Sequence, residues 1–187
     1  MANYLDIQHC DMVNGTGLRT VIWMAGCDRN CPGCFSPYTH DPKGGIPFDD
    51  SAKEELFRDS SEEWCSGITF VGGEPMHPCN RELVISLAKE HKERFPEKTV
   101  WMYTGYTWSE LLEDPTMSEI IRYANVICDG PFVESLKDPD LRWVGSSNQT
   151  VIDVKKRIKQ ISDISSKDFS GTGCLPDSLV SAHSPTT

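Results

Sequence analysis

The chain has 187 residues, of which 38% are hydrophobic and 25% charged, values typical of a globular domain. It has 18 basic and 28 acidic side chains, which give a formal net charge of −10 at pH 7. Because this charge repels a phosphate backbone, we expect no nucleic acid partner. No apolar stretch reaches the ~18 residues of a membrane span, and the N-terminus does not have the pattern of a signal peptide. We therefore expect a cytoplasmic protein that does not bind membranes.

Apolar runs rich in β-branched and aromatic residues predict the strands of the core. The first expected strand precedes them within residues 4–20, where Asn14, Gly15 and Gly17 indicate a turn. Four core strands follow, at residues 19–26, 67–71, 99–104 and 125–129.

Helical patterns separate these strands. One begins near Asp49 and continues to residue 57. A second begins at Asn80, which we expect to be its N-cap, and ends before Pro96. Two pairs with capping-box spacing predict one or two short helices before the last core strand: Thr107 with Glu110, and Thr116 with Glu119. Strands that alternate with helices predict an α/β fold with a mostly parallel sheet.

The composition changes toward the C-terminus, where residues 162–187 are rich in Ser and Thr and show little apolar periodicity. Burying such a segment would recover little of the entropy lost in ordering it, so we expect a flexible tail. The predicted domain boundaries are therefore 1–161 for the folded domain and 162–187 for the tail.

Three of the eight cysteines lie within eight residues, with the spacing C-x3-C-x2-C: Cys27, Cys31 and Cys34. In a reducing compartment they are available as metal ligands. One interpretation is a structural zinc ion, which needs a fourth ligand such as His40, Cys10 or Cys65. The other is a four-iron cluster with three cysteine ligands and one iron open to another ligand.

Turns with distinctive residues follow the other core strands. They are Gly72-Gly73-Glu74, Thr104-Gly105 and Asp129-Gly130. In parallel α/β folds the carboxyl ends of the strands form the ligand-binding face, so the cysteine loop and these turns should converge on one pocket. A zinc module gains nothing from such convergence.

The cysteine loop and the Gly-Gly-Glu turn together resemble the radical S-adenosylmethionine enzymes. The resemblance implies a [4Fe-4S] cluster held by the three clustered cysteines, with S-adenosylmethionine chelating the open iron and no catalytic side chain beyond the cluster ligands. The Gly-Gly-Glu turn is then expected to bind the amino group of the cofactor, and Asp129 its ribose hydroxyls. The implied cofactor-binding residues are Gly33, Cys34, Phe35, Gly72, Gly73, Glu74, Thr104, Gly105 and Asp129.

Over residues 4–154 the resemblance narrows to the activating proteins of anaerobic ribonucleoside-triphosphate reductases, a group of glycyl radical enzyme activases. It implies an oxidoreductase that cleaves S-adenosylmethionine reductively to a 5′-deoxyadenosyl radical and generates a glycyl radical on the large subunit of the reductase. The implied fold is a partial, open βα barrel with about four to six mostly parallel strands, since a closed barrel typically needs ~250 residues. Arg29, expected to be an exposed cation, would guide an acidic electron donor such as flavodoxin.

Two other functions remain open at this point. One is a small radical S-adenosylmethionine enzyme that acts on a metabolite, and the other is a zinc-binding module without catalytic activity. For Tyr103 and Tyr106 we expect packing rather than ligand contact. Cys65, Cys79 and Cys128 are expected to be small buried hydrophobic residues.

Overall fold

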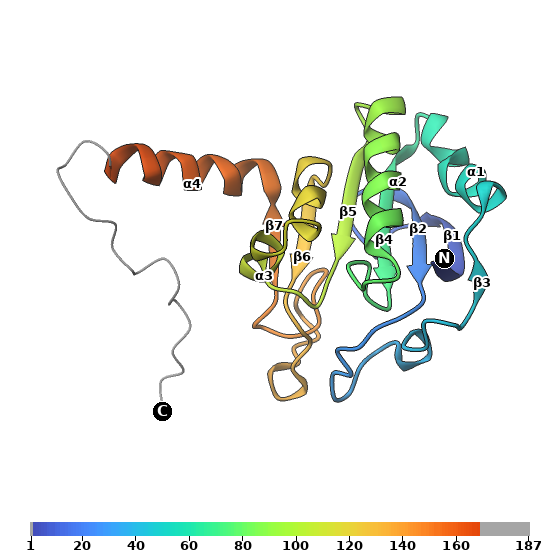
Figure 1. The fold of residues 1–187 in the computed structure, drawn as a ribbon, viewed down its shortest axis with the longest axis horizontal. Helices are drawn as coiled ribbons and strands as arrows, with labels where there is room; N and C mark the ends of the chain where they lie inside the picture. Colours follow the sequence, from blue (N-terminus) through green and yellow to red (C-terminus); the bar gives the residue numbers. More distant parts are fainter. Residues whose placement is uncertain (1, 169–187) are drawn as a thin grey trace. The chain divides into compact units, whose positions relative to one another are not determined.

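The computed structural model describes residues 2–168, and within this range the strands form one seven-stranded sheet (Figure 1). The order across the sheet is β3-β1-β2-β4-β5-β6-β7. The strands are β1 (Asn3–Asp11), β2 (Leu18–Met24), β3 (Ile46–Pro47), β4 (Cys65–Gly72), β5 (Thr99–Tyr103), β6 (Val126–Asp129) and β7 (Thr150–Asp153).

The four predicted core strands, β2, β4, β5 and β6, are confirmed and run parallel to one another. The predicted N-terminal strand is also confirmed as β1, which pairs antiparallel with β2. The expected count of four to six strands was too low for the described part of the chain. The two-residue strand β3 is too short to produce a sequence pattern, and β7 adds an antiparallel edge beside β6.

Helices fill the connections between the parallel strands. They are α1 (Asp50–Arg58), α2 (Arg81–Arg94) and α3 (Trp108–Glu113), with short 3-10 helices η1 (Pro37–Thr39), η2 (Asp59–Ser61) and η3 (Met117–Arg122). A fourth 3-10 helix, η4 (Glu134–Leu136), lies between β6 and the antiparallel strand β7. Each connection from β2 to β6 moves the chain in the same direction across the sheet. Right-handed crossovers therefore place α1, α2 and α3 on one face of the sheet. In Figure 1, α2 lies in front of the strands and runs along them.

The helix caps agree only in part with the sequence prediction. Asp49 caps α1, and Thr107 and Glu110 form the expected capping box of α3. Asn80 precedes α2, but its side chain does not cap the helix. Before η3, the carboxylate of Asp114 accepts hydrogen bonds from two backbone amides in place of the predicted Thr116 cap. Local spacing alone therefore does not decide which side chain caps a helix.

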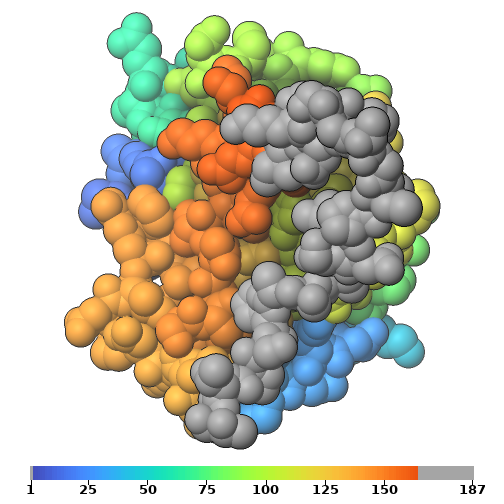
Figure 2. All heavy atoms as spheres, turned by 90° about the vertical axis from the view of Figure 1, so that its left-hand side faces the viewer, coloured from blue at the N-terminus to red at the C-terminus, as the bar shows by residue number. Residues whose placement is uncertain are grey.

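Alternation along the strands separates the two faces of the sheet. The side chains that face the helices form the hydrophobic core, among them Ile22, Phe70 and Met102, all 0% exposed. Their neighbours in sequence point to the opposite face, which we call the inner face. The long connection between β6 and β7 contains η4 and forms a broad surface, orange in Figure 2.

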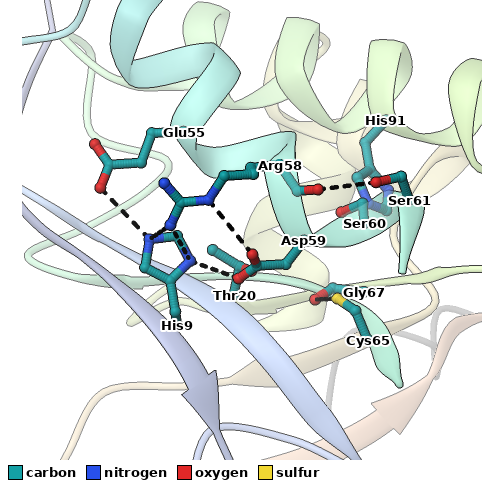
Figure 3. A network of polar contacts seen from close by, with 10 residues as sticks. All are labelled: His9, Thr20, Glu55, Arg58, Asp59, Ser60, Ser61, Cys65, Gly67 and His91. Atoms are coloured by element: carbon teal, nitrogen blue, oxygen red, sulfur yellow. Dashed lines mark hydrogen bonds and ion pairs between the residues drawn. The ribbon is translucent and has the colours of Figure 1, made fainter. Parts of the chain in front are cut away.

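A polar network joins β1 to the first helical connection (Figure 3). The His9 Nδ1 atom lies 2.5 Å from Asp59 Oδ2, and the Arg58 guanidinium lies 3.0 Å from His9 Nε2. Thr20 on β2 donates a hydrogen bond to the same Asp59 oxygen. Asp59 is 8% exposed, and its carboxylate would be costly to bury without partners. His9, Thr20 and Arg58 are these partners. The network holds η2 against the sheet at the end remote from the cysteine loop.

Two units make up the chain, Met1–Val154 and Lys155–Thr187. Helix α4 (Val154–Asp168) begins at their boundary and continues past residue 161, where the sequence placed the domain end. The rest of the predicted tail, residues 169–187, lies outside the described residues. No helix within residues 2–168 has the length and hydropathy needed to cross a membrane.

Candidate functional site

Loops at the carboxyl ends of β2, β4, β5 and β6 surround a cavity of about 260 Å³. The sequence predicted this convergence, and most of the predicted site residues line the cavity. These are Cys27, Cys31, Cys34, Phe35, Gly72, Gly73, Glu74, Thr104 and Gly105. Gly33 and Asp129 were also predicted but do not line it.

The cysteine loop leaves the end of β2 and folds back beside it. The Gly26 amide donates to the Thr39 carbonyl oxygen at 2.8 Å, and the Cys27 amide donates to that of His40 at 3.1 Å. These bonds close the loop around its three cysteines. The three thiols are half-buried and form no disulfide, so all three remain available as ligands at the cavity.

Two of the three candidate fourth ligands for zinc lie far from the cysteine loop, whereas the third, His40, belongs to that loop, and its Nε2 atom is buried without a hydrogen-bond partner among the described residues. Cys65 begins β4 and Cys10 precedes the β1–β2 turn, so both lie at the opposite end of the sheet from the cysteine loop. Seven residues of strand separate the two ends, roughly 20 Å. Within the described residues, no three His, Cys, Asp or Glu side chains are placed to hold a single metal ion. A cluster requires no such focus, since each cysteine binds a different iron.

The Gly-Gly-Glu turn packs directly against the cysteine loop. A Cβ atom on Gly73 would lie 2.5 Å from the Gly26 carbonyl oxygen and 2.9 Å from that of Thr39. The Glu74 amide donates to the same Gly26 oxygen at 2.8 Å. Glycine is therefore required at residue 73 by contact within the protein.

Glu74 is 2% exposed and joins two turns of the site. Its Oε1 accepts from Thr104 Oγ1 at 2.7 Å and from the Met76 amide at 2.9 Å, and its Oε2 accepts from the Gly105 amide at 2.7 Å. Burial raises the pKa of this carboxyl above its usual value, and these hydrogen bonds oppose the rise. The side chain thus holds the turn after β5 against the turn after β4.

The side chain of Asn80 connects the Gly-Gly-Glu turn to the residue that follows the end of β2. Its side-chain amide donates to the Ala25 carbonyl at 2.8 Å and to the Glu74 carbonyl at 3.0 Å. The Asn80 side chain is completely buried, and because it is used in these two hydrogen bonds it does not cap α2. His77 Nε2 lies 2.9 Å from Asp28 Oδ2 and adds a further link between the turn and the cysteine loop.

Neighbouring residues of a strand point to opposite faces of the sheet. Cys128 lines the cavity, so Asp129 points away from it. The Asp129 carboxylate accepts from the Trp108 amide at 2.7 Å, at the start of α3, and from the Thr150 amide at 3.2 Å. It therefore supports the helix layer and strand β7.

Arg29 is not the exposed cation that the sequence suggested. Its side chain is 24% exposed, forms an ion pair with Glu110 at 3.3 Å, and lies 4.0 Å from the centre of the Tyr106 ring. The guanidinium is thus used to fix the cysteine loop to the start of α3. The expectation failed because both partners lie about eighty residues away in the chain, beyond the range of local patterns.

The inner face contributes four residues to the cavity lining that were not predicted as site residues: Trp23, Val71, Tyr103 and Cys128. They form one row across adjacent strands, since Trp23 pairs with Val71 and Tyr103 with Cys128. We call this row the cavity floor. Each is the last inward residue before a site loop, so strand alternation counted back from the loops is the signal that would have found them.

Comparison with known proteins identifies the family. A model for a 4Fe-4S single cluster domain matches residues 13–152. An anaerobic ribonucleoside-triphosphate reductase-activating protein of Enterobacteria phage T4 is 39% identical over 147 residues, which cover 79% of this chain and 91% of that protein. Proteins of the same description are 36% identical in Escherichia coli K12 and 34% identical in Pasteurella multocida, each over 151 residues. These two alignments cover 80% of this chain and 97% and 96% of the relatives.

The family model agrees with the structure, because residues 13–152 include every residue that lines the cavity. This chain belongs to the anaerobic ribonucleoside-triphosphate reductase-activating proteins, which are activating enzymes with a 4Fe-4S domain.

Proposed function

We propose that Cys27, Cys31 and Cys34 bind a [4Fe-4S] cluster and that S-adenosylmethionine binds in the adjacent cavity, so that the protein generates a glycyl radical on an anaerobic ribonucleoside-triphosphate reductase. The observation that carries the proposal is the convergence of the three thiols and the Gly-Gly-Glu turn on one cavity. When bound, the cluster and S-adenosylmethionine would supply a reductive carbon–sulfur cleavage and the 5′-deoxyadenosyl radical that takes a hydrogen atom from a glycine Cα.

In this proposal the protein's task is placement. The contact between Gly73 and the cysteine loop fixes the position of the Gly-Gly-Glu turn relative to the three thiols that would hold the cluster. Glu74 keeps the turns after β4 and β5 together, so that the backbone of both is preorganised for the cofactor. Phe35 is 95% exposed at the cavity and offers a ring surface for the nucleoside.

A macromolecular substrate is favoured by the form of the sheet. Strands β3 and β7 are its two edges, so the sheet is open, as in a partial βα barrel. A glycine-containing loop of the reductase large subunit can enter from the open side and exclude water from the cavity. The expectation of an acidic electron donor such as flavodoxin rested on Arg29, which is paired with Glu110 and does not offer a free positive charge.

The deciding experiment is electron paramagnetic resonance on protein prepared without oxygen and mixed with reductant, S-adenosylmethionine and the reductase. We expect a carbon-centred glycyl radical that is missing when any one component is omitted. Turnover of a free metabolite without the reductase would favour the metabolite-modifying alternative. Zinc in place of about four irons per chain would support the binding module and refute the proposal.

A further inference from the structure

Two oxidisable side chains in the cavity floor have no task in the proposed function. Tyr103 on β5 and Cys128 on β6 are direct partners in the parallel ladder, so their side chains lie beside each other on the inner face. Both line the cavity that contains the three clustered cysteines. Cys128 is 1% exposed, and the Tyr103 hydroxyl oxygen is buried and interacts with the Cys128 side chain.

The environment keeps both groups protonated. Burial raises the pKa of Cys128 to about 12, and burial followed by the neighbouring Cys128 raises the pKa of Tyr103 above its usual 10.0. A neutral thiol and a neutral phenol each carry a hydrogen atom that can leave as an atom. Their S–H and O–H bonds are weaker than the C–H bond of a methyl group, so both can reduce a primary carbon radical.

The other floor residues lack this property. Trp23 has its indole N–H engaged with Gln8 Oε1 at 2.9 Å, and Val71 has only C–H bonds. The three cluster cysteines are ligands in the proposed function and carry no S–H hydrogen. Tyr106 packs under the Arg29 guanidinium and is not a lining residue. Tyr103 and Cys128 are therefore the pair suited to hydrogen-atom donation.

We propose that Cys128 and Tyr103 form an internal hydrogen-atom donor that quenches the adenosyl radical when no glycine loop occupies the cavity. This inference rests on the proposed function. The Cys128 S–H bond breaks, its hydrogen atom forms the new C–H bond of 5′-deoxyadenosine, and the sulfur becomes a thiyl radical. The Tyr103 O–H hydrogen then passes to that sulfur and leaves a tyrosyl radical. One electron from the low-potential donor that reduces the cluster, with one proton, restores the phenol.

Solvent isotope labelling tests the pair, because S–H and O–H hydrogens exchange with water whereas C–H hydrogens do not. Protein with its cluster is equilibrated in D₂O without oxygen and given reductant and unlabelled S-adenosylmethionine, with no reductase. Mass spectrometry of the 5′-deoxyadenosine should show a single deuterium in its methyl group. Freeze-quenched samples should show a tyrosyl signal in electron paramagnetic resonance.

Variants assign the two steps. Cys128→Ser preserves size and should lower the deuterated fraction by roughly tenfold, since a hydroxyl O–H bond is too strong to donate and proximity controls the transfer. Cys128→Ala provides a second variant with the same expectation. Tyr103→Phe should retain deuterium and lose the tyrosyl signal. Cys65→Ala is the matched control, because that thiol is equally buried but lies at the other end of β4.

The outcomes separate the inference from the function on which it rests. Absence of 5′-deoxyadenosine even after the reductase is added to wild-type protein would refute the proposed function, whereas its absence only without the reductase would overturn the donor pair. Formation of 5′-deoxyadenosine without deuterium, or unchanged deuterium in the Cys128→Ser/Tyr103→Phe double variant, would overturn the donor pair and leave the proposed function standing.

Discussion

The two faces of the sheet are built from the same four parallel strands, yet they carry different chemistry. The face toward the helices is apolar and closed, with residues such as Ile68 and Val100 at 0% exposure. The inner face carries Thr69, Tyr103 and Cys128, and at its carboxyl end it borders a cavity. Strand alternation lets one element serve both purposes, so stability is concentrated on one face and ligand binding on the other.

The amino end of the inner face departs from this division. Arg19 is completely buried there, and its guanidinium donates to Thr69 Oγ1 at 2.7 Å and to the Ile68 carbonyl at 2.6 Å. Further bonds reach the hydroxyl and carbonyl oxygens of Thr99. Burial lowers the pKa of Arg19 to about 10, which still leaves it charged at neutral pH. The inner face therefore has a structural role at the amino ends of the strands, which we call its base. Only its carboxyl end borders the cavity.

The largest expected effect tests the carboxyl end of the inner face. Cys27→Ala, Cys31→Ala and Cys34→Ala should each lose the cluster and all activity, because two thiolates hold a four-iron cluster too weakly. Iron content and visible absorption after anaerobic reconstitution measure this. Cys65→Ala is the control and should keep both. Full iron in any of the three variants would show that the ligands are misassigned.

The next effect tests the structural base. Arg19→Met should destabilise the fold by about 3 kcal/mol, since it leaves the buried oxygens of Thr69, Thr99 and Ile68 without their donor. Urea unfolding measures the change. Arg122→Met, which removes an exposed arginine from an i,i+3 ion pair, is the control and should lie within about 0.5 kcal/mol of wild type. Equal stability of the two variants would show that the base of the inner face is not structural.

A smaller effect concerns the contact between the Gly-Gly-Glu turn and the cysteine loop. Gly73→Ala should cost about 2 kcal/mol, because its Cβ atom must displace the Gly26 or Thr39 carbonyl oxygen. The displaced loop should also retain less iron. Gly130→Ala provides a contrast, since its Cβ atom would meet only ordinary contacts, although its φ of +93° adds some strain. Normal iron and weakened S-adenosylmethionine binding in Gly73→Ala would instead support direct contact with the cofactor.

The helix face should respond to pH through His91. This residue of α2 is completely buried, and its Nε2 atom lies 3.0 Å from Ser60 Oγ on η2. Burial lowers its pKa from 6.5 to about 3. The unfolded chain takes up a proton that the folded state excludes. The contribution of the neutral ring is therefore complete above pH 6.5 and decreases as the pH falls toward 3.

His91→Gln tests this dependence by removing the titrating group. The slope of the unfolding free energy below pH 6.5 should decrease by up to about 1.4 kcal/mol per pH unit relative to wild type. Urea unfolding at several pH values between 7.5 and 5 supplies the measurement. An unchanged slope would show that His91 does not account for the acid sensitivity of the helix face.

The smallest effect is expected outside both faces. A truncation that ends at Ile161 should keep its iron content and its ability to cleave S-adenosylmethionine. Ser162 and Asp163, the first residues removed from α4, are exposed, so ending the helix at Ile161 removes little buried surface there. Failure of the truncated protein to fold or to bind iron would refute the domain boundary predicted from the sequence.

The sequence by itself determined the features that depend on local patterns. Runs of β-branched residues located the four parallel strands to within two residues at each end. The C-x3-C-x2-C spacing and the Gly-Gly-Glu turn located the loops of the site, because ligand spacing and close backbone approach require those residue types in that order. Parallel connectivity then explains why these loops meet at one end of the sheet.

Only the tertiary structure decided how individual side chains are used. Asp129 and Cys128 are adjacent in sequence, and the pairing of β5 with β6 determines that the thiol faces the cavity and the carboxylate faces the helices. The constraint on Gly73 and the pairing of Arg29 depend on backbone and side chains tens of residues away. Such contacts exist only after the strands have taken their register, so local propensity and spacing do not encode them separately.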